Sequence, residues 1–125
     1  MDKKAAVREI KSNNNNSTIR NVLDGSDDTF WMSNGSSNVE IEMAYEGSAE
    51  SITVDFQKGF QPKSIKIIEC SSSSNEVFLS KSDAKVKILL KSVILNQPKN
   101  DSIIFQFGDT YDLYGRICIY NIVFE

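Results

Sequence analysis

The stretch Val39-Glu40-Ile41-Glu42-Met43-Ala44-Tyr45 alternates apolar side chains with charged or small ones. Successive side chains of a β-strand point to opposite faces of a sheet, so this pattern predicts a strand with one buried face and one wet face. The same period of two recurs at residues 52–56 and 85–91. Shorter apolar runs at residues 65–68 and 103–107 are rich in isoleucine and phenylalanine, which favour strands. We therefore predict a chain built mainly of β-strands.

Two segments nearer the ends are also assigned to strands. Residues 117–124 are almost continuously apolar, which predicts a strand covered on both faces. Residues 4–10 would also suit a short helix, because alanine and straight-chain charged residues favour that state, but we assign them to a strand. Turn-rich stretches separate the runs, at residues 12–18, 24–28, 33–38, 47–51, 71–75 and 96–102. Such punctuation predicts an all-β fold, an antiparallel β-sandwich of about eight strands arranged as a jelly roll.

Two of these turns contain homopolymer tracts, asparagine at residues 13–16 and serine at residues 71–74. Polar tracts bury too little apolar surface to repay the entropy of ordering them. We predict that both are surface loop expansions without a function.

The size and charge of the chain limit its possible roles. Its 125 residues fit one domain, residues 1–125, and we expect a complete protein of this length. The 14 basic and 17 acidic side chains give a formal charge of -3. Proteins that bind nucleic acid neutralise phosphates with clustered basic residues, whereas these lysines are scattered and the arginines are Arg8, Arg20 and Arg116 alone. We expect no nucleic-acid partner.

The start of the chain and its cysteines indicate a compartment. No apolar run approaches the roughly 20 residues that span a bilayer, and Met1-Asp2-Lys3-Lys4 lacks the apolar core of a secretory signal. We expect an intracellular protein, in the cytoplasm or the nucleus, without membrane contact. Cys70 and Cys118 are expected to be reduced, partly buried thiols, with a disulfide or a reactive site as the lesser alternative.

Catalysis finds little support in the sequence. Histidine is absent, which removes the commonest general base and the commonest metal ligand. A serine or cysteine nucleophile would need a lysine or a carboxylate as its base. No pair of carboxylates stands out for glycoside hydrolysis. We predict that the protein is not an enzyme.

The densest group of acidic and turn residues lies at residues 21–35. Asp24, Asp27, Asp28 and Thr29 could present several hard oxygens to one cation, which is the ligand type that calcium takes. The spacing does not match an EF-hand loop. Acidic turns are more often only solvated, so a metal site and a solvated turn both remain open here.

Aromatic and basic side chains near turns form a second group of candidates. Trp31 is either a core anchor or a platform on which a sugar could stack. Tyr111, Tyr114 and Arg116 belong to the types that make interface hot spots, and the arginine offers a planar fork for a carboxylate. The alternative is a tight turn in which this arginine pairs with an acidic neighbour.

Three segments carry a resemblance to a known fold family. Asn21-Val22-Leu23-Asp24-Gly25-Ser26-Asp27-Asp28-Thr29-Phe30-Trp31-Met32-Ser33 resembles the "DG…T.W.S" signature of galactose-binding-like domains of the discoidin and factor V/VIII type C kind, a signature shared by family 32 carbohydrate-binding modules. Phe56-Gln57-Lys58-Gly59-Phe60 and Tyr114-Gly115-Arg116-Ile117-Cys118-Ile119-Tyr120 resemble a small intracellular, nuclear-receptor-associated branch of this fold. The segments extend over nearly the whole chain, from about Ala6 to Glu125.

The resemblance implies a jelly roll with ligand-binding loops at one end. It implies a structural calcium ion held by Asp24, Asp27 and Thr29, with Glu125 as a closing ligand from the last strand. Intracellular members of the fold act as protein-interaction subunits. Our first hypothesis is therefore a non-catalytic adaptor that binds a protein partner through its apical loops, and our second is a carbohydrate-binding module. The predicted binding face consists of Trp31, Gln57, Lys58, Phe60, Tyr111, Tyr114 and Arg116.

Overall fold

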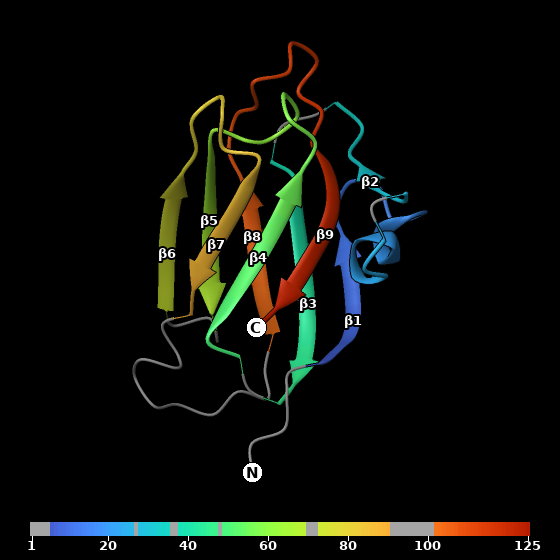
Figure 1. The fold of residues 1–125 in the computed structure, drawn as a ribbon, viewed down its shortest axis with the longest axis vertical. Coiled ribbons are helices and arrows are strands. Elements are labelled where there is room, and N and C mark those ends of the chain that lie inside the picture. Colours follow the sequence, from blue (N-terminus) through green and yellow to red (C-terminus); the bar gives the residue numbers. More distant parts are fainter. Residues whose placement is uncertain (1–5, 27, 36–37, 48, 70–72, 91–101) are drawn as a thin grey trace.

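The computed structural model describes residues 6–26, 28–35, 38–47, 49–69, 73–90 and 102–125 (Figure 1). These residues form nine strands and one short 3-10 helix, η1 (Ile19–Leu23). The strands are β1 (Ala6–Ser12), β2 (Trp31–Met32), β3 (Glu40–Glu46), β4 (Ser51–Phe56), β5 (Ser64–Glu69), β6 (Ser73–Phe78), β7 (Lys85–Leu89), β8 (Ser102–Phe107) and β9 (Cys118–Phe124). In the described part of the chain, no helix is long and apolar enough to cross a membrane.

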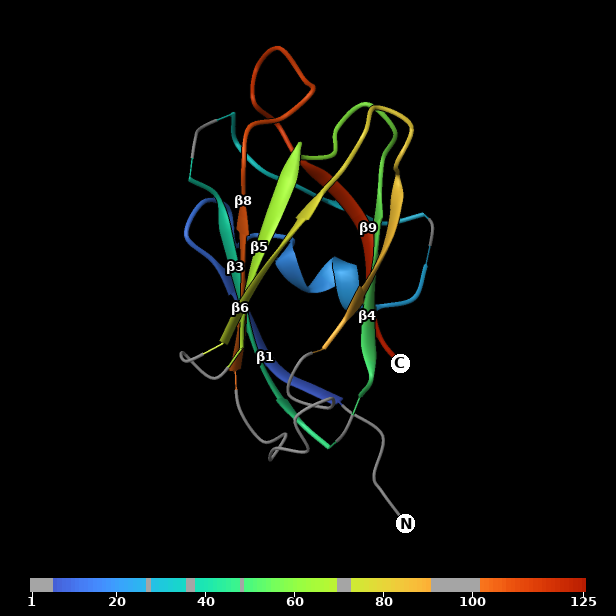
Figure 2. The same ribbon diagram turned by 90° about the vertical axis from the view of Figure 1, so that its left-hand side faces the viewer.

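The strands form two sheets that face each other (Figure 2). One sheet has five strands in the order β1-β3-β8-β5-β6, and the other has four in the order β2-β9-β4-β7. Every neighbouring pair within them is antiparallel. The predicted antiparallel β-sandwich of the jelly-roll kind is confirmed. The segment that also suited a helix is strand β1 from residue 6 onward.

Along strand β3, the alternation of apolar and polar side chains decides which residues point to the inner face of the sheet. Ile41 and Met43 are buried, whereas Glu42 between them points to the outer face and is partly exposed. On the neighbouring strand β8, Phe105 lies opposite Ile41 and Ile103 lies opposite Met43. Cross-strand partners share one face of a sheet, so this register gathers all four apolar side chains on the inner face.

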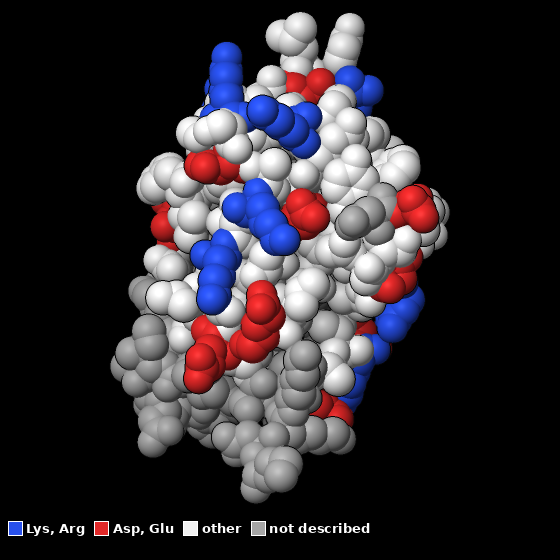
Figure 3. Space-filling model, in the orientation of Figure 1, with Lys and Arg blue, Asp and Glu red and all other residues white. Residues whose placement is uncertain are grey.

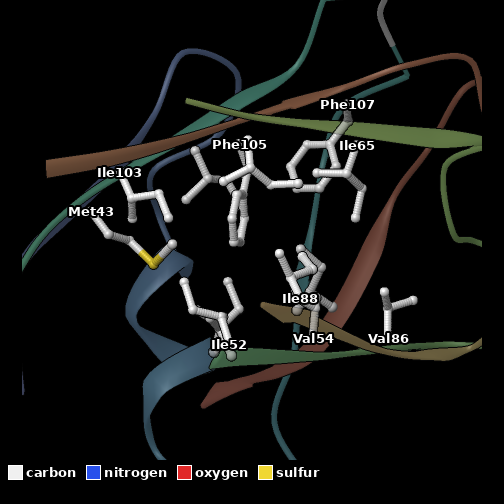
Figure 4. Packing of buried hydrophobic residues seen from close by; sticks show 14 of the residues in the cluster. Met43, Ile52, Val54, Ile65, Val86, Ile88, Ile103, Phe105 and Phe107 are labelled. Atoms are coloured by element: carbon white, nitrogen blue, oxygen red, sulfur yellow. The ribbon is translucent and has the colours of Figure 1, made fainter. Parts of the chain in front are cut away.

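The inner faces of the two sheets meet in one apolar layer (Figure 4). Phe105 and Phe107 of the five-stranded sheet lie across from Ile52, Val54 and Ile88 of the four-stranded sheet. All five side chains are buried. Burial of one such side chain stabilises a fold by about 1.5–3 kcal/mol, so this layer is the main source of stability.

Helix η1 closes one side of the sandwich, where it lies between the two sheets (Figure 2). Its residues Ile19 and Val22 are buried, and the helix contacts β9, β1 and β2. Cys118 and Ile119 are consecutive residues of β9 and are both buried, so both faces of this part of the strand are covered. The prediction of a strand covered on both faces is correct there, whereas Val123 near its end is 43% exposed.

Two strands were not predicted from the sequence. β2 has two residues, which is too short for a period to appear. β6 is an edge strand that pairs only with β5 and is mostly polar. It includes residues 73–74 of the serine tract, which are therefore strand and not loop, while residues 71–72 lie outside the described part of the chain.

The asparagine tract has a structural role that the sequence did not reveal. Each of the four side-chain amides in residues 13–16 bonds to backbone groups. Asn13 illustrates this, because its Nδ2 donates to the carbonyl of Asn38 at 2.7 Å and its Oδ1 accepts from the N–H of Glu40 at 2.8 Å. The tract lies in a loop, as predicted, and it joins the end of β1 to the loop before β3.

Replacing Asn13 tests this joint. We expect Asn13→Ala to lower the free energy of unfolding by about 1–2 kcal/mol, because two hydrogen bonds to backbone groups are lost. Urea unfolding measures the change. Thr18→Ala is the matched control, since Thr18 precedes η1 without a side-chain capping bond and its loss should cost little. Equal effects of the two variants would contradict a joining role for Asn13.

Candidate functional site

Four loops meet at one end of the sandwich, which we call the apical end (top of Figure 1). They are the described parts of residues 33–38, 57–63, 79–84 and 108–117. Loops carry many binding sites because a rigid scaffold can position them without fixing their sequence. The apical end is therefore the first place to look for a site.

Hydrogen bonds tie the apical loops to one another. The N–H of Cys118 donates to the carbonyl of Phe60 at 3.1 Å. Gln61 is buried, and its Nε2 donates to the carbonyls of Ser80 at 3.2 Å and Lys81 at 2.9 Å. A buried amide with its bonds satisfied holds its surroundings in one arrangement. The loops thus form a connected surface.

Asp112 organises the loop at residues 108–117. Its carboxylate accepts from Arg116 Nε at 2.9 Å and Nη2 at 3.2 Å, and from the backbone N–H groups of Arg116 and Tyr114 at 3.0 and 3.2 Å. The hydrogen-bonded guanidinium of Arg116 lowers the pKa of Asp112 to about 2. Gly115 has a φ of 72°, which glycine adopts without strain. Arg116 therefore pairs with an acidic neighbour, the alternative left open by the sequence, and its fork is already occupied.

Arg116 also braces two aromatic rings. Its guanidinium carbon lies 5.3 Å from the centroid of the Phe60 ring and 5.2 Å from that of Tyr114. Cations at such distances are attracted to the faces of aromatic rings. Tyr114 remains 73% exposed and the neighbouring Leu113 is 96% exposed, so the tip of the loop presents a braced ring to solvent.

A cleft of about 270 Å³ lies beside this ring. It is lined by Gly35, Asn38, Phe107, Gly108, Asp109, Thr110, Tyr114 and Gly115. A Cβ atom at Gly35 would collide with the carbonyl oxygen of Tyr114, so a glycine is needed for the two loops to approach this closely. Asn38 has a φ of 60°, in the left-handed region that asparagine tolerates better than most residues.

Two polar side chains of the cleft are available to a ligand. Within the described residues, neither the amide of Asn38 nor the carboxylate of Asp109 forms a hydrogen bond or an ion pair. Thr110 differs, because its hydroxyl donates to the carbonyl of Asp112 at 2.9 Å. Small-molecule sites combine an apolar surface with a few polar groups, and in this cleft Phe107 and Tyr114 supply the apolar part.

The structure separates Trp31 from the rest of the predicted binding face. Its side chain is fully buried, and its Nε1 donates to the carbonyl of Asn15 at 2.7 Å. A buried indole cannot stack on a ligand, so the prediction of Trp31 as a binding residue is wrong and it is a core anchor.

The other predicted binding residues all lie at the apical end, in different environments. Lys58 is exposed on the turn closed by the bond from the N–H of Phe60 to the carbonyl of Gln57, at 2.9 Å. Tyr111 is partly buried, and its hydroxyl donates to the carbonyl of Leu79 at 2.5 Å. Tyr111 therefore supports the loop, and Tyr114 is the aromatic residue that faces solvent.

The predicted calcium ligands are only partly brought together. Asp24 accepts hydrogen bonds from the Thr29 hydroxyl and from the N–H of Ser26, which lower its pKa. Glu125 instead accepts from the hydroxyl of Thr53 at 2.6 Å. Asp27 lies outside the described part of the chain, and within the described part no three acidic, histidine or cysteine side chains cluster. Because calcium takes six to eight oxygens, the described residues alone do not complete a site.

The sequence did not identify all of the cleft. Asp109 and Thr110 lie in the same loop as the predicted binding residues Tyr111 and Tyr114, whereas Asn38 was predicted only to belong to a turn. The sequence feature that marks Asn38 is its position at the end of a Gly/Ser/Asn-rich turn, directly before the alternating strand.

The two cysteines differ in what the structure describes. Cys118 is buried and free, and burial raises the pKa of its thiol to about 11. Cys70 lies outside the described residues. A thiol with so high a pKa is unreactive at neutral pH.

Comparisons with known proteins define the fold. No family model matches the chain. No curated protein matches it either. Among solved structures, CpGH89CBM32-6 produced by Clostridium perfringens is 16% identical with a TM-score of 0.63, over 94% of this chain and 91% of that one. GH31 CBM32-2 bound to GalNAc is 15% identical with a TM-score of 0.65, over 95% and 97%. The CBM32 of AlyQ in complex with 4,5-unsaturated mannuronic acid is 14% identical with a TM-score of 0.64, over 100% and 98%.

These likenesses establish a galactose-binding-like jelly roll of the kind seen in family 32 carbohydrate-binding modules. At sequence identities of 14–16%, this structural likeness shows the fold alone. The expected relation to a nuclear-receptor-associated branch finds no support among them, nor does the expected protein partner. The two neighbours with a bound ligand are named as family 32 carbohydrate-binding modules, the class of protein in our second hypothesis.

The pair of Asp112 and Arg116 makes a prediction about acid stability. Because the folded-state pKa of Asp112 is depressed from 3.8 to about 2, its contribution is present above about pH 4 and is lost as the pH falls toward 2. Asp112→Asn should lower stability near neutral pH, and urea unfolding should show its difference from the wild type shrinking below pH 4. The double variant with Arg116→Lys should be non-additive, since both changes break one pair. Parallel curves for wild type and Asp112→Asn would contradict this account.

Calcium remains a sequence-based prediction with its own test. If residues 24–29 bind calcium, an excess of calcium added after EDTA should raise the midpoint of thermal unfolding. The reason is that a ligand that binds the folded state stabilises it by mass action. Asp24→Asn should then abolish the shift. An unchanged midpoint would identify residues 24–29 as an ordinary solvated turn.

Proposed function

We propose that this chain is a non-catalytic carbohydrate-binding domain that holds a sugar in the apical cleft. The observation that carries the proposal is the exposed ring of Tyr114, in contact with Arg116, beside a cleft with two polar side chains that pair with no described residue. The fold is shared with carbohydrate-binding modules. A sugar presents an apolar C–H face and a rim of hydroxyls. The cleft offers a surface for each.

The Tyr114 ring suits the apolar face of a sugar. Arg116 interacts with this ring and restrains it, yet most of the side chain stays exposed. A ring held in place before binding loses little conformational entropy when a ligand arrives. Phe107 adds an apolar wall to the cleft.

Asn38 and Asp109 suit the hydroxyl rim. A carboxylate accepts hydrogen bonds at two oxygens, and an amide both donates and accepts, so the two groups can engage neighbouring hydroxyls. Neither has a side-chain hydrogen bond or ion pair to another described residue that a sugar would have to replace. The absence of histidine supports binding without catalysis, since it leaves the cleft without the commonest general base. The intracellular location expected from the sequence is independent of sugar binding and stays a prediction.

The proposal predicts the effect of removing the ring. Tyr114→Ala should weaken binding of any recognised glycan by at least about tenfold, because the stacking surface is lost while the fold is retained. A glycan array with the wild type identifies ligands, and isothermal titration with both proteins measures the loss.

Phe30→Ala is the matched control for this test. Phe30 is also an exposed aromatic residue, at 47%, but it precedes β2 and does not line the cleft. Its replacement should leave glycan binding unchanged. An array without reproducible preference, together with capture of a protein partner that depends on Tyr114, would instead favour the adaptor hypothesis.

A further inference from the structure

We infer that the apical cleft selects against acidic sugars, with Asp109 as the residue that determines this preference. The inference rests on the proposed sugar-binding function and adds the charge class of the ligand. It comes from the distribution of charge around the cleft and not from any relative.

Among the described residues that line the cleft, only Asp109 carries a charge. Its carboxylate is exposed and forms no ion pair or hydrogen bond with another described residue. Its backbone is fixed by the bond from the N–H of Lys63 to its carbonyl at 2.5 Å, and by its position next to the end of β8. The carboxylate is thus a negative charge without an ion pair among the described residues, carried on a stretch of backbone that is held in place.

Two basic side chains near the cleft have partners other than Asp109. Arg116 forms its two-pronged bond with Asp112, so the pair contributes no net charge. The Lys63 ammonium lies 5.5 Å from the centroid of the Tyr111 ring. Neither Arg116 nor Lys63 lines the cleft. On the face drawn in Figure 3, basic and acidic side chains are interspersed. Lys85 and Lys87 are exposed residues of β7 and do not line the cleft.

A uronic acid would bring its carboxylate into this negative site. Two like charges about 4 Å apart repel with an energy that corresponds to roughly a fivefold loss of affinity in water, and to more when water is excluded. A neutral hydroxyl at the same place would instead donate a hydrogen bond to Asp109, and an amino sugar would place an ammonium there. Such a cleft differs in charge preference from a module that holds an unsaturated mannuronic acid.

Matched pairs of sugars test the inference. The probes are galactose with galacturonate, glucose with glucuronate, and mannose with mannuronate, titrated into the ¹⁵N-labelled protein at low ionic strength. We expect the neutral member of any bound pair to bind about threefold to tenfold more tightly than its uronate. Asp109→Asn should remove most of that gap, because the repulsion is lost while an acceptor oxygen remains. Glucosamine should bind at least as well as glucose to the wild type and lose this advantage in the variant.

Glu46→Gln is the control, because it removes one negative charge at the far end of β3, where Glu46 faces Arg8 across an exposed pair. It should leave the gap unchanged. A uronate that binds the wild type as tightly as its neutral partner, or a gap that survives Asp109→Asn, would overturn the inference while sugar binding stands. Failure of every sugar to bind would overturn the proposed function itself, and the inference with it.

Discussion

The inner face of each sheet is apolar, and the opposite sheet covers most of it. Phe105 cannot be kept from water by its own strand neighbours, because they lie beside it and not above it. Ile52 and Ile88 of the opposite sheet provide that cover. This mutual burial fixes the register of the strands that alternate apolar and polar side chains, such as β3 and β8, since a slip by one residue would turn their apolar side chains to the solvent.

The position of the candidate site follows from that register. Because β3 begins and β8 ends at the same end of the five-stranded sheet, the loops before Glu40 and after Phe107 are brought together there. The glycine at position 35 lets these loops touch, and the pair of Asp112 and Arg116 gives the longer one a defined shape. A rigid sandwich therefore presents a cleft with a braced aromatic ring at its rim.

The sequence predicted those features that depend on local pattern. The strand around Ile41 and Met43 was recognisable because a period of two appears within a few residues. β6 was missed because its polar edge position leaves no such period. Whether Trp31 is buried depends on the segments that pack over it. The cleft exists because Asn38 and Asp109, which are far apart in the sequence, line the same surface. Neither is a local property, so the apical loops could be singled out but the cleft between them could not.

The central claim is that the apical cleft binds a sugar, and mapping of backbone amide signals during a glycan titration tests it most directly. The ¹⁵N-labelled protein would be titrated with the glycans that score on an array. The account predicts concentration-dependent shifts at Gly35, Asn38 and residues 108–116, with little change in β1 or β6. Shifts confined to other surfaces, or none with any glycan, would contradict it.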